Sequence, residues 1–297
     1  MSGIFERVTG LAELYRLTGG GDEAIRIALL DGPVASGHPS FAGARLALLS
    51  PQARPARAAH GTHVASIVAG QPGGMVEGVA PRCTTLCVEL YREDENGDLI
   101  GCAATALARA INRAAANDVS IISIGGGLQT PPGQRDRFLD QVLAGCAGRN
   151  ILIVAPVGDD GGDHLQFAAA GPALLAVVAA DDGGRLPQLA DGGDTVAQCG
   201  LLAPGQRIAG ATADGGVSFR NGAGFAAAVV SGVAALLLSL RRQRGLAPDP
   251  LGIRDLLLRT ADPRTPGEDT DRTQTPAGRL NVERAVAAVL GQDEQHA

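Results

Sequence analysis

The chain has 297 residues, 45% of them hydrophobic and 3% aromatic with no Trp, so it can build a large but aliphatic core. The net charge is −6, all 25 basic residues are arginine and no basic stripe stands out, which argues against nucleic-acid binding. No apolar stretch long enough to cross a bilayer is free of polar interruption, so we expect no membrane span.

The N-terminal segment, residues 1–20, is predicted to be a helical extension. Apolar residues recur near helical spacing from Ile4 through Val8 and Leu11 to Leu17, which predicts an amphipathic helix over residues 4–17. Glycines at positions 19–21 then break the chain. The segment lacks the apolar core of a signal peptide, so we expect a cytoplasmic protein.

Strand and helix patterns alternate through the middle of the chain. Continuous apolar runs predict strands covered on both faces, over residues 25–30, 84–91, 119–124, 151–157 and 174–180. Helical spacing falls between them, over residues 102–116 and 135–147. This alternation predicts an α/β fold, with a doubly wound and mostly parallel sheet and helices on both faces.

The C-terminal part completes a single predicted domain of residues 1–297. Short irregular strands are expected over residues 201–217, a very apolar buried helix over 223–240 and closing helices over 248–261 and 280–290. Residues 262–278 are polar and proline-rich, which predicts a surface loop. Functional groups of such folds gather beyond the carboxyl ends of the strands.

The five cysteines are an odd number and lack CxxC spacing. That pattern predicts scattered buried thiols, with one bridge such as Cys83 to Cys87 as the alternative.

Two residues at strand and helix ends suggest a catalytic pair. Asp31 ends a buried strand, and His60 opens an apolar helix some thirty residues later. Asp31 alone could cap a turn with Gly32, but an Asp followed by His60-Gly61-Thr62-His63 suits a carboxylate that orients an imidazole. A metal pair of His60 and His63 is conceivable, although HExxH spacing and an obvious third ligand are lacking, so no metal or other cofactor is expected.

The motif order resembles that of the subtilisin-like serine proteases. The segments IALLDGPV, HGTHVASIVAG, EGVAP, SIISIGGG, ILIVAPVGDDG and NGAGFAAAVVSGVAALLLSL follow one another as they do in that superfamily, from about residue 20 to 290. Within it, the chain looks most similar to the cyanobactin-maturation proteases, which act on ribosomally made precursor peptides. The cues are a short N-terminal helix, LDGPV, GQPGGMVEGVAP, and the closing pattern AALLLSLRRQRGLAPDP with AGRLNVERAV.

The resemblance assigns roles and also shows two gaps. Asp31 and His60 match the aspartate and histidine of the triad, but Gly224 stands where the nucleophilic serine is expected. Asp159 stands where the family has the asparagine that donates to the oxyanion. Glycine offers no nucleophile, and an ionised carboxylate accepts hydrogen bonds but cannot donate them.

The same resemblance implies a substrate strand at Ser123, Ile124, Gly125, Gly126 and Gly127. Its glycines leave the backbone open to an extended peptide, with Gly125 and Gly126 flanking the first specificity pocket. The alternative is that the glycines only lead the chain from a strand into a loop.

Three hypotheses for the function follow. The first is a pseudoprotease that binds a precursor or leader peptide, or pairs with a homologous active protease as a heteromer. The second is an active endopeptidase that uses another serine, Ser218 or less favourably Ser231, or whose serine at position 224 was replaced experimentally. The third is a structural or oligomerisation module, for which no feature of the sequence speaks.

Overall fold

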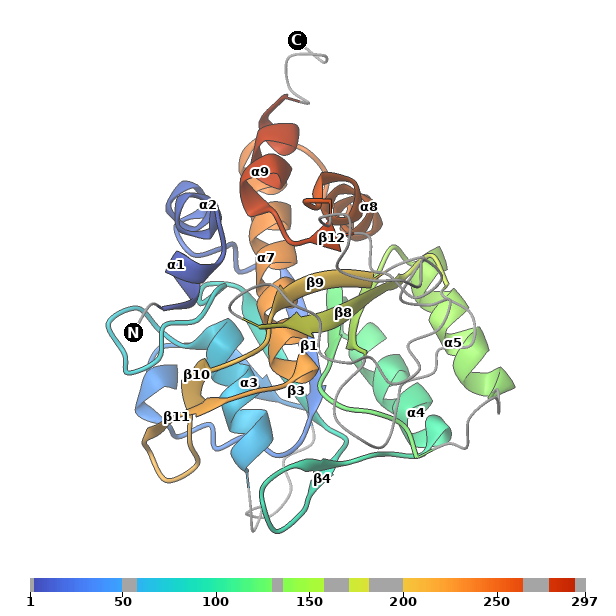
Figure 1. Cartoon of the computed structure of the whole chain (residues 1–297). Coiled ribbons are helices and arrows are strands. Elements are labelled where there is room, and N and C mark those ends of the chain that lie inside the picture. Colours follow the sequence, from blue (N-terminus) through green and yellow to red (C-terminus); the bar gives the residue numbers. More distant parts are fainter. Residues whose placement is uncertain are drawn as a thin grey trace.

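The computed structural model describes residues 3–49, 58–129, 136–157, 171–181, 200–263 and 278–291. Its centre is an eight-stranded sheet in the order β12-β9-β8-β7-β6-β1-β3-β2 (Figure 1). All neighbouring strands in it run parallel. The strands are β1 (Arg26–Asp31), β2 (Leu46–Leu48), β3 (Thr84–Glu89), β6 (Ile121–Ile124), β7 (Leu152–Pro156), β8 (Leu174–Ala180), β9 (Gly200–Pro204) and β12 (Gly278–Arg279).

Two small hairpins stand outside the main sheet. The first pairs β4 (Arg92–Glu93) with β5 (Leu99–Ile100), and the second pairs β10 (Ile208–Ala211) with β11 (Val217–Arg220). A short 3-10 turn, η1 (Pro39–Phe41), precedes β2.

Helices cover both faces of the sheet, as Figure 1 shows. One face packs with α2 (Leu11–Thr18), α3 (Ala59–Ala69), α7 (Ala223–Gln243), α8 (Pro250–Thr260) and α9 (Val282–Gly291). The other face packs with α4 (Ala104–Ala115) and α5 (Arg137–Gly148). The predicted α/β class with a parallel, doubly wound sheet is therefore confirmed.

The central helix α7 explains why that part of the sequence is so apolar. Every residue from Ala223 to Leu240 is buried. By length and composition α7 could cross a membrane, yet the whole apolar window lies inside the protein. The small residue Gly232 lets Val79, in the loop between α3 and β3, approach the helix closely.

The N-terminal extension differs from the single helix expected over residues 4–17. It forms α1 (Ile4–Arg7) and then α2, because Gly10 takes a left-handed φ of 84° between them. A side chain at Gly10 would also collide with the backbone of Glu283 in α9. Leu11 and Leu14 are fully buried in the core, so the extension packs as part of it.

The thiol pattern is settled for the described cysteines. Cys83, Cys87, Cys102 and Cys146 are free and buried, so the alternative of a Cys83–Cys87 bridge is wrong. Burial raises the pKa of the Cys87 thiol to about 12, which keeps it protonated. Cys199 and most of the predicted surface loop, residues 264–277, lie outside the described residues.

We predict that Gly232→Ala destabilises the protein. A Cβ at position 232 would lie 2.7 Å from Cβ of the buried Val79. Overpacking of this kind costs about 1–3 kcal/mol, which should outweigh the helix-propensity gain of about 1 kcal/mol. The matched control is Gly145→Ala in α5, where nothing lies within 4 Å and stability should rise. Urea unfolding measures both changes, and equal effects of the two substitutions would contradict the packing.

Candidate active site

Asp31 and His60 meet at the carboxyl edge of the sheet. Asp31 is the last residue of β1, which lies between β3 and β6 where the strand order reverses direction. Such a switch point is where ligands of open α/β sheets bind. His60 Nδ1 donates to Asp31 Oδ1 over 2.8 Å, and the two residues are 8% and 2% exposed. The structure therefore brings together the two residues that the sequence analysis paired.

The first turn of α3 is positioned by two further features. The carboxylate of Glu93, in β4, accepts from the backbone N–H groups of Ala59 and His60 over 2.9 and 2.8 Å. A negative charge at a helix N-terminus satisfies free N–H groups and offsets the helix dipole. Gly61 has no side chain because a Cβ there would collide with the carbonyl oxygens of Gly32 and Pro33.

Glu93 is a residue that the sequence analysis missed. The sequence did contain a signal for such a residue. The helix α3 begins after Ala58, whose side chain cannot accept a hydrogen bond from the first turn of the helix. A helix that starts at a functional histidine without a local cap calls for an acceptor from elsewhere in the fold.

Position 224 lies directly beside the imidazole of His60. A Cβ built on Gly224 would stand 3.5 Å from His60 Cε1, so a side chain at this position would point at the ring. The same Cβ would lie only 2.5 Å from the carbonyl oxygen of Gly125. The space that a serine side chain needs is therefore partly taken by the backbone at the end of β6.

Gly125 is itself held tightly between two parts of the site. Its N–H donates to the carbonyl of Leu30 over 2.9 Å, and a Cβ on it would collide with Asp31 Oδ2. That oxygen is buried and has no hydrogen-bond partner in the described part of the chain, while Asp31 Oδ1 also accepts from the N–H of Gly32 over 2.6 Å. Only glycine fits at position 125 without moving the aspartate.

The Phe225 ring packs beside both His60 and His63, and Arg220 packs on that ring. The ring of Phe225, next to Gly224, lies 4.8 Å from His60 and 4.7 Å from His63 between ring centroids. The guanidinium of Arg220 lies 5.7 Å from the Phe225 ring centroid and donates to the carbonyl of Gly97 over 3.0 and 3.1 Å. Arg220 thus connects β11 to the β4–β5 turn across this ring.

The segment predicted as a substrate strand runs from β6 into the loop that follows it, where the carbonyls of Gly126 and Gly127 already accept hydrogen bonds. Ser123 and Ile124 are buried in β6, opposite Leu29 and Leu30 of β1. The hydroxyl of Tyr91 donates to the Gly126 carbonyl over 2.8 Å, and the Cys102 N–H donates to the Gly127 carbonyl over 3.2 Å. A bound peptide would have to rely on the N–H groups of this segment and on the second lone pairs of its carbonyls.

The alternative serines do not contact His60. The hydroxyl of Ser231 is fully buried and donates to the Ala227 carbonyl over 2.8 Å. Ser218 Oγ lies 3.4 Å from Nδ1 of His63. Since His63 Nε2 faces the Ile208 carbonyl at 3.0 Å and must donate to it, Nδ1 is the acceptor for the Ser218 hydroxyl.

Burial makes His63 a poor base for Ser218. It lowers the pKa of His63 to about 3, with smaller contributions from the charges of His60 and Arg220. An imidazole this weakly basic drives proton transfer from a serine poorly at neutral pH.

The structure leaves Asp159 unplaced and offers no support for the alternative of a metal pair at His60 and His63 in the described part of the chain. Asp159 lies outside the described residues, beyond the end of β7. Among the described residues, no group of three or more His, Cys, Asp or Glu side chains could hold a metal ion. His60 and His63 direct ring nitrogens at Asp31 and Ile208 rather than at a shared point.

The order of the site residues along the chain is informative. Asp31 comes first, then His60, then Gly224 beside the imidazole. Subtilisin-like serine proteases have their aspartate, histidine and nucleophile in this order, whereas chymotrypsin-type and α/β-hydrolase enzymes have other orders. The parallel sheet and the buried helix that begins at the nucleophile position agree with that class. The chain belongs to the subtilase family, Peptidase_S8, whose profile matches residues 22–286.

Solved structures support the narrower resemblance to peptide-maturation proteases. The prenylagaramide maturation protease PagA is 39% identical, with coverage of 96% of this chain and 99% of its own and a TM-score of 0.85. The patellamide maturation protease PatA is 43% identical, with coverage of 91% and 98% and a TM-score of 0.79. The PatG macrocyclase in complex with peptide is 26% identical, with coverage of 98% and 99% and a TM-score of 0.86.

The curated relatives share less of the sequence with this chain than PagA and PatA do. A subtilisin-like protease of Coccidioides posadasii (strain C735) is 27% identical over 256 residues, and this chain spans 60% of its length. Subtilisin BL of Lederbergia lenta is 26% identical over 249 residues, with 85% of its length covered.

We predict that His63 contributes a distinct pH dependence to stability. Its native pKa of about 3 lies below the ordinary value of 6.5, so between these values the unfolded chain binds one more proton. The contribution of His63 to the free energy of unfolding is therefore complete above pH 6.5. Between pH 6.5 and about 3 it falls by about 1.4 kcal/mol for each pH unit.

The measurement compares the unfolding free energy of the natural protein with that of His63→Gln, whose amide can still donate to the Ile208 carbonyl. The difference between the two should shrink steadily as the pH falls from 6 to 4. Parallel curves over that range would show that His63 titrates normally in the folded protein.

Proposed function

We propose that this subtilase has no peptidase activity and binds a peptide, a ribosomally made precursor or its leader, during peptide maturation. One observation carries the proposal: Gly224 occupies the place beside His60 to which a nucleophile would have to be attached. Without a hydroxyl there, no acyl-enzyme can form. In subtilisin, loss of the nucleophile lowers kcat by about 10⁶-fold.

The remaining groups can bind and orient but have nothing to activate. His60 is held by Asp31, and within the described residues its Nε2 makes no hydrogen bond. The sequence gives a second argument for inactivity. An ionised Asp159 carboxylate at the oxyanion position would oppose the negative charge that develops there during peptide hydrolysis. In subtilisin, the asparagine donor alone is worth about 10²–10³-fold in kcat.

Peptide binding is supported by the backbone that persists around the site. Gly126 and Gly127 are half-buried at the end of β6 and carry no side chains that would block an extended chain. The PatG macrocyclase, which has the same fold, has been solved with a peptide. A homologous active protease as heteromeric partner remains part of the proposal; it would supply the chemistry that Gly224 cannot.

We predict that Gly224→Ser restores at most weak hydrolysis of a precursor peptide. The new Cβ would press on the Gly125 carbonyl, and Asp159 would still oppose the oxyanion. The double variant with Gly224→Ser and Asp159→Asn should be about 10²–10³-fold faster than Gly224→Ser alone. Turnover is measured by mass spectrometry of the products.

The control for this experiment is Gly224→Ala. It introduces the same steric contact with Gly125 but no hydroxyl, so it should be less stable than the natural protein and inactive. Full activity of the single serine variant would show that Asp159 is no obstacle.

We also predict that a precursor peptide protects the backbone of residues 125–129 from hydrogen exchange. The Gly127 backbone faces Cys102, so the N–H of Gly126 is the donor that an added strand would use, and its exchange should slow at saturating peptide. Calorimetry on the same samples gives the affinity. Peptide binding without protection of this segment would place the peptide elsewhere, and no binding of either precursor or leader would contradict the proposal.

A further inference from the structure

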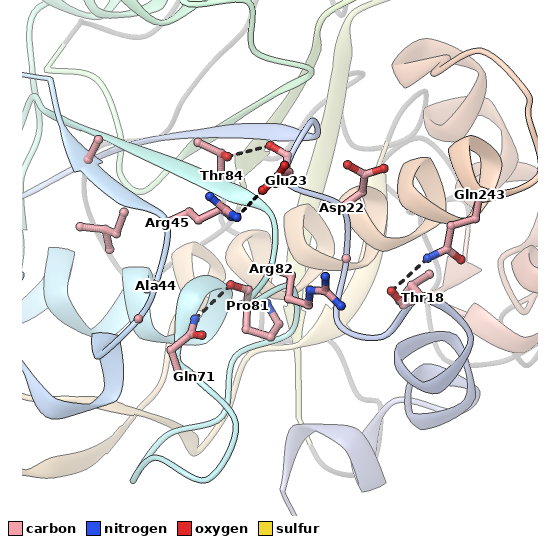
Figure 2. Close-up of a pocket in the computed structure, with 14 residues that line it drawn as sticks. Thr18, Asp22, Glu23, Ala44, Arg45, Gln71, Pro81, Arg82, Thr84 and Gln243 are labelled. Atoms are coloured by element: carbon pink, nitrogen blue, oxygen red, sulfur yellow. Dashed lines mark hydrogen bonds and ion pairs between the residues drawn. The ribbon is translucent and has the colours of Figure 1, made fainter.

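A cavity lies at the amino ends of the strands, at the opposite end of the sheet from the Asp31–His60 pair. Its volume is about 940 Å³, within the range of small-molecule and peptide sites. It opens where β1, β2 and β3 begin, whereas Asp31 is at the far end of β1. Figure 2 shows its polar lining, of which Asp22, Glu23, Arg45, Gln71, Arg82 and Gln243 carry the argument.

The charges in this cavity leave one arginine uncompensated. Asp22 accepts from Nε of Arg242 over 2.9 Å, and Glu23 forms an ion pair with Arg45. Arg82 is exposed and acts on Asp22 only through space. Within the described part of the chain, its guanidinium makes no hydrogen bond or ion pair. It is therefore the group in the cavity that a carboxylate would meet.

The backbone beside this arginine can accept another strand. The Thr85 N–H donates to the Arg45 carbonyl, and the Leu49 N–H donates to the Cys87 carbonyl, so residues 45, 47 and 49 face β3. In a parallel ladder the alternate residues face the other way, so the N–H and C=O of Leu46 point away from β3. β2 is the end of the sheet in the described chain, and Leu46 lines the cavity.

Neutral acceptors complete the lining. The amide of Gln71 donates to the carbonyls of Ala69 and Pro81, and that of Gln243 donates to the Thr18 carbonyl. Both side-chain oxygens remain able to accept from a ligand N–H. Among the described residues, the cavity thus combines one arginine that lacks an ion pair, amide acceptors and a strand edge, which is the complement of an extended acidic peptide.

We propose that this cavity binds an extended acidic peptide segment, which adds as a strand at Leu46 of β2 and places a carboxylate on Arg82. The site is separate from the Asp31–His60 pair and does not depend on the function proposed for that region. A small free carboxylate could satisfy Arg82 alone, but it would leave the strand edge and most of the volume unused.

The test uses a fluorescein-labelled peptide of six residues in which glutamate alternates with valine, with binding followed by fluorescence anisotropy. Two control peptides are used. One carries glutamine in place of each glutamate, and the other carries methyl groups on alternate backbone nitrogens. Protein variants are Arg82→Gln, Leu46→Pro, which removes an N–H that β3 does not use, and the control Arg109→Gln on the exposed side of α4. Hydrogen exchange of the unmodified protein reports on residues 44–48.

We expect saturable binding of the glutamate peptide. Arg82→Gln should weaken it about tenfold, because one charge-assisted hydrogen bond is lost. The same substitution should leave the affinity for the glutamine peptide unchanged. Arg109→Gln should bind normally, and both backbone methylation and Leu46→Pro should weaken binding. Residues 44–48 should be protected while residues 125–129 are not. Absent binding, equal affinity of Arg82→Gln, or free glutamate competing as well as the peptide would each overturn the proposal for this cavity, leaving the proposal for the His60 region untouched.

Discussion

The hydrogen bond between His60 and Asp31 joins the end of the central strand β1 to the first turn of α3, and both partners are almost fully buried. Removing either partner would leave the other buried and unsatisfied, which costs about 1–3 kcal/mol and more for a charged group. Glu93 reinforces the same turn through two backbone N–H groups. These contacts give the pair a structural role that does not depend on a nucleophile beside His60.

The geometry around this bond also explains the glycines of the site. Gly61 lets α3 approach the backbone after β1, and Gly125 lies against the carboxylate of Asp31. Because Gly125 is fixed by the aspartate, its carbonyl stands close to position 224. Glycine at position 224 relieves that contact. The Asp31 side chain, the end of β6 and the start of α7 therefore form one packed unit whose members cannot change independently.

Much of this arrangement could be predicted from the sequence. Apolar runs with helices between them identified the parallel sheet, and the Asp31 and His60 motifs gave the correct hydrogen-bonded pair. The break of the N-terminal helix at Gly10 was missed, because it depends on a contact with α9 far along the chain. Glu93, Arg220 and the Arg82 cavity depend in the same way on loops that only the folded chain brings together.

The central claim is that this subtilase fold carries its aspartate–histidine pair without any activated serine. It is tested most directly by intact-mass measurement after prolonged exposure of the unmodified protein to a fluorophosphonate, which labels only activated serines. The account predicts an unchanged mass, because Gly224 has no hydroxyl and Ser218 faces only the weakly basic His63. A stoichiometric adduct that maps to Ser218 or to any other serine would contradict it.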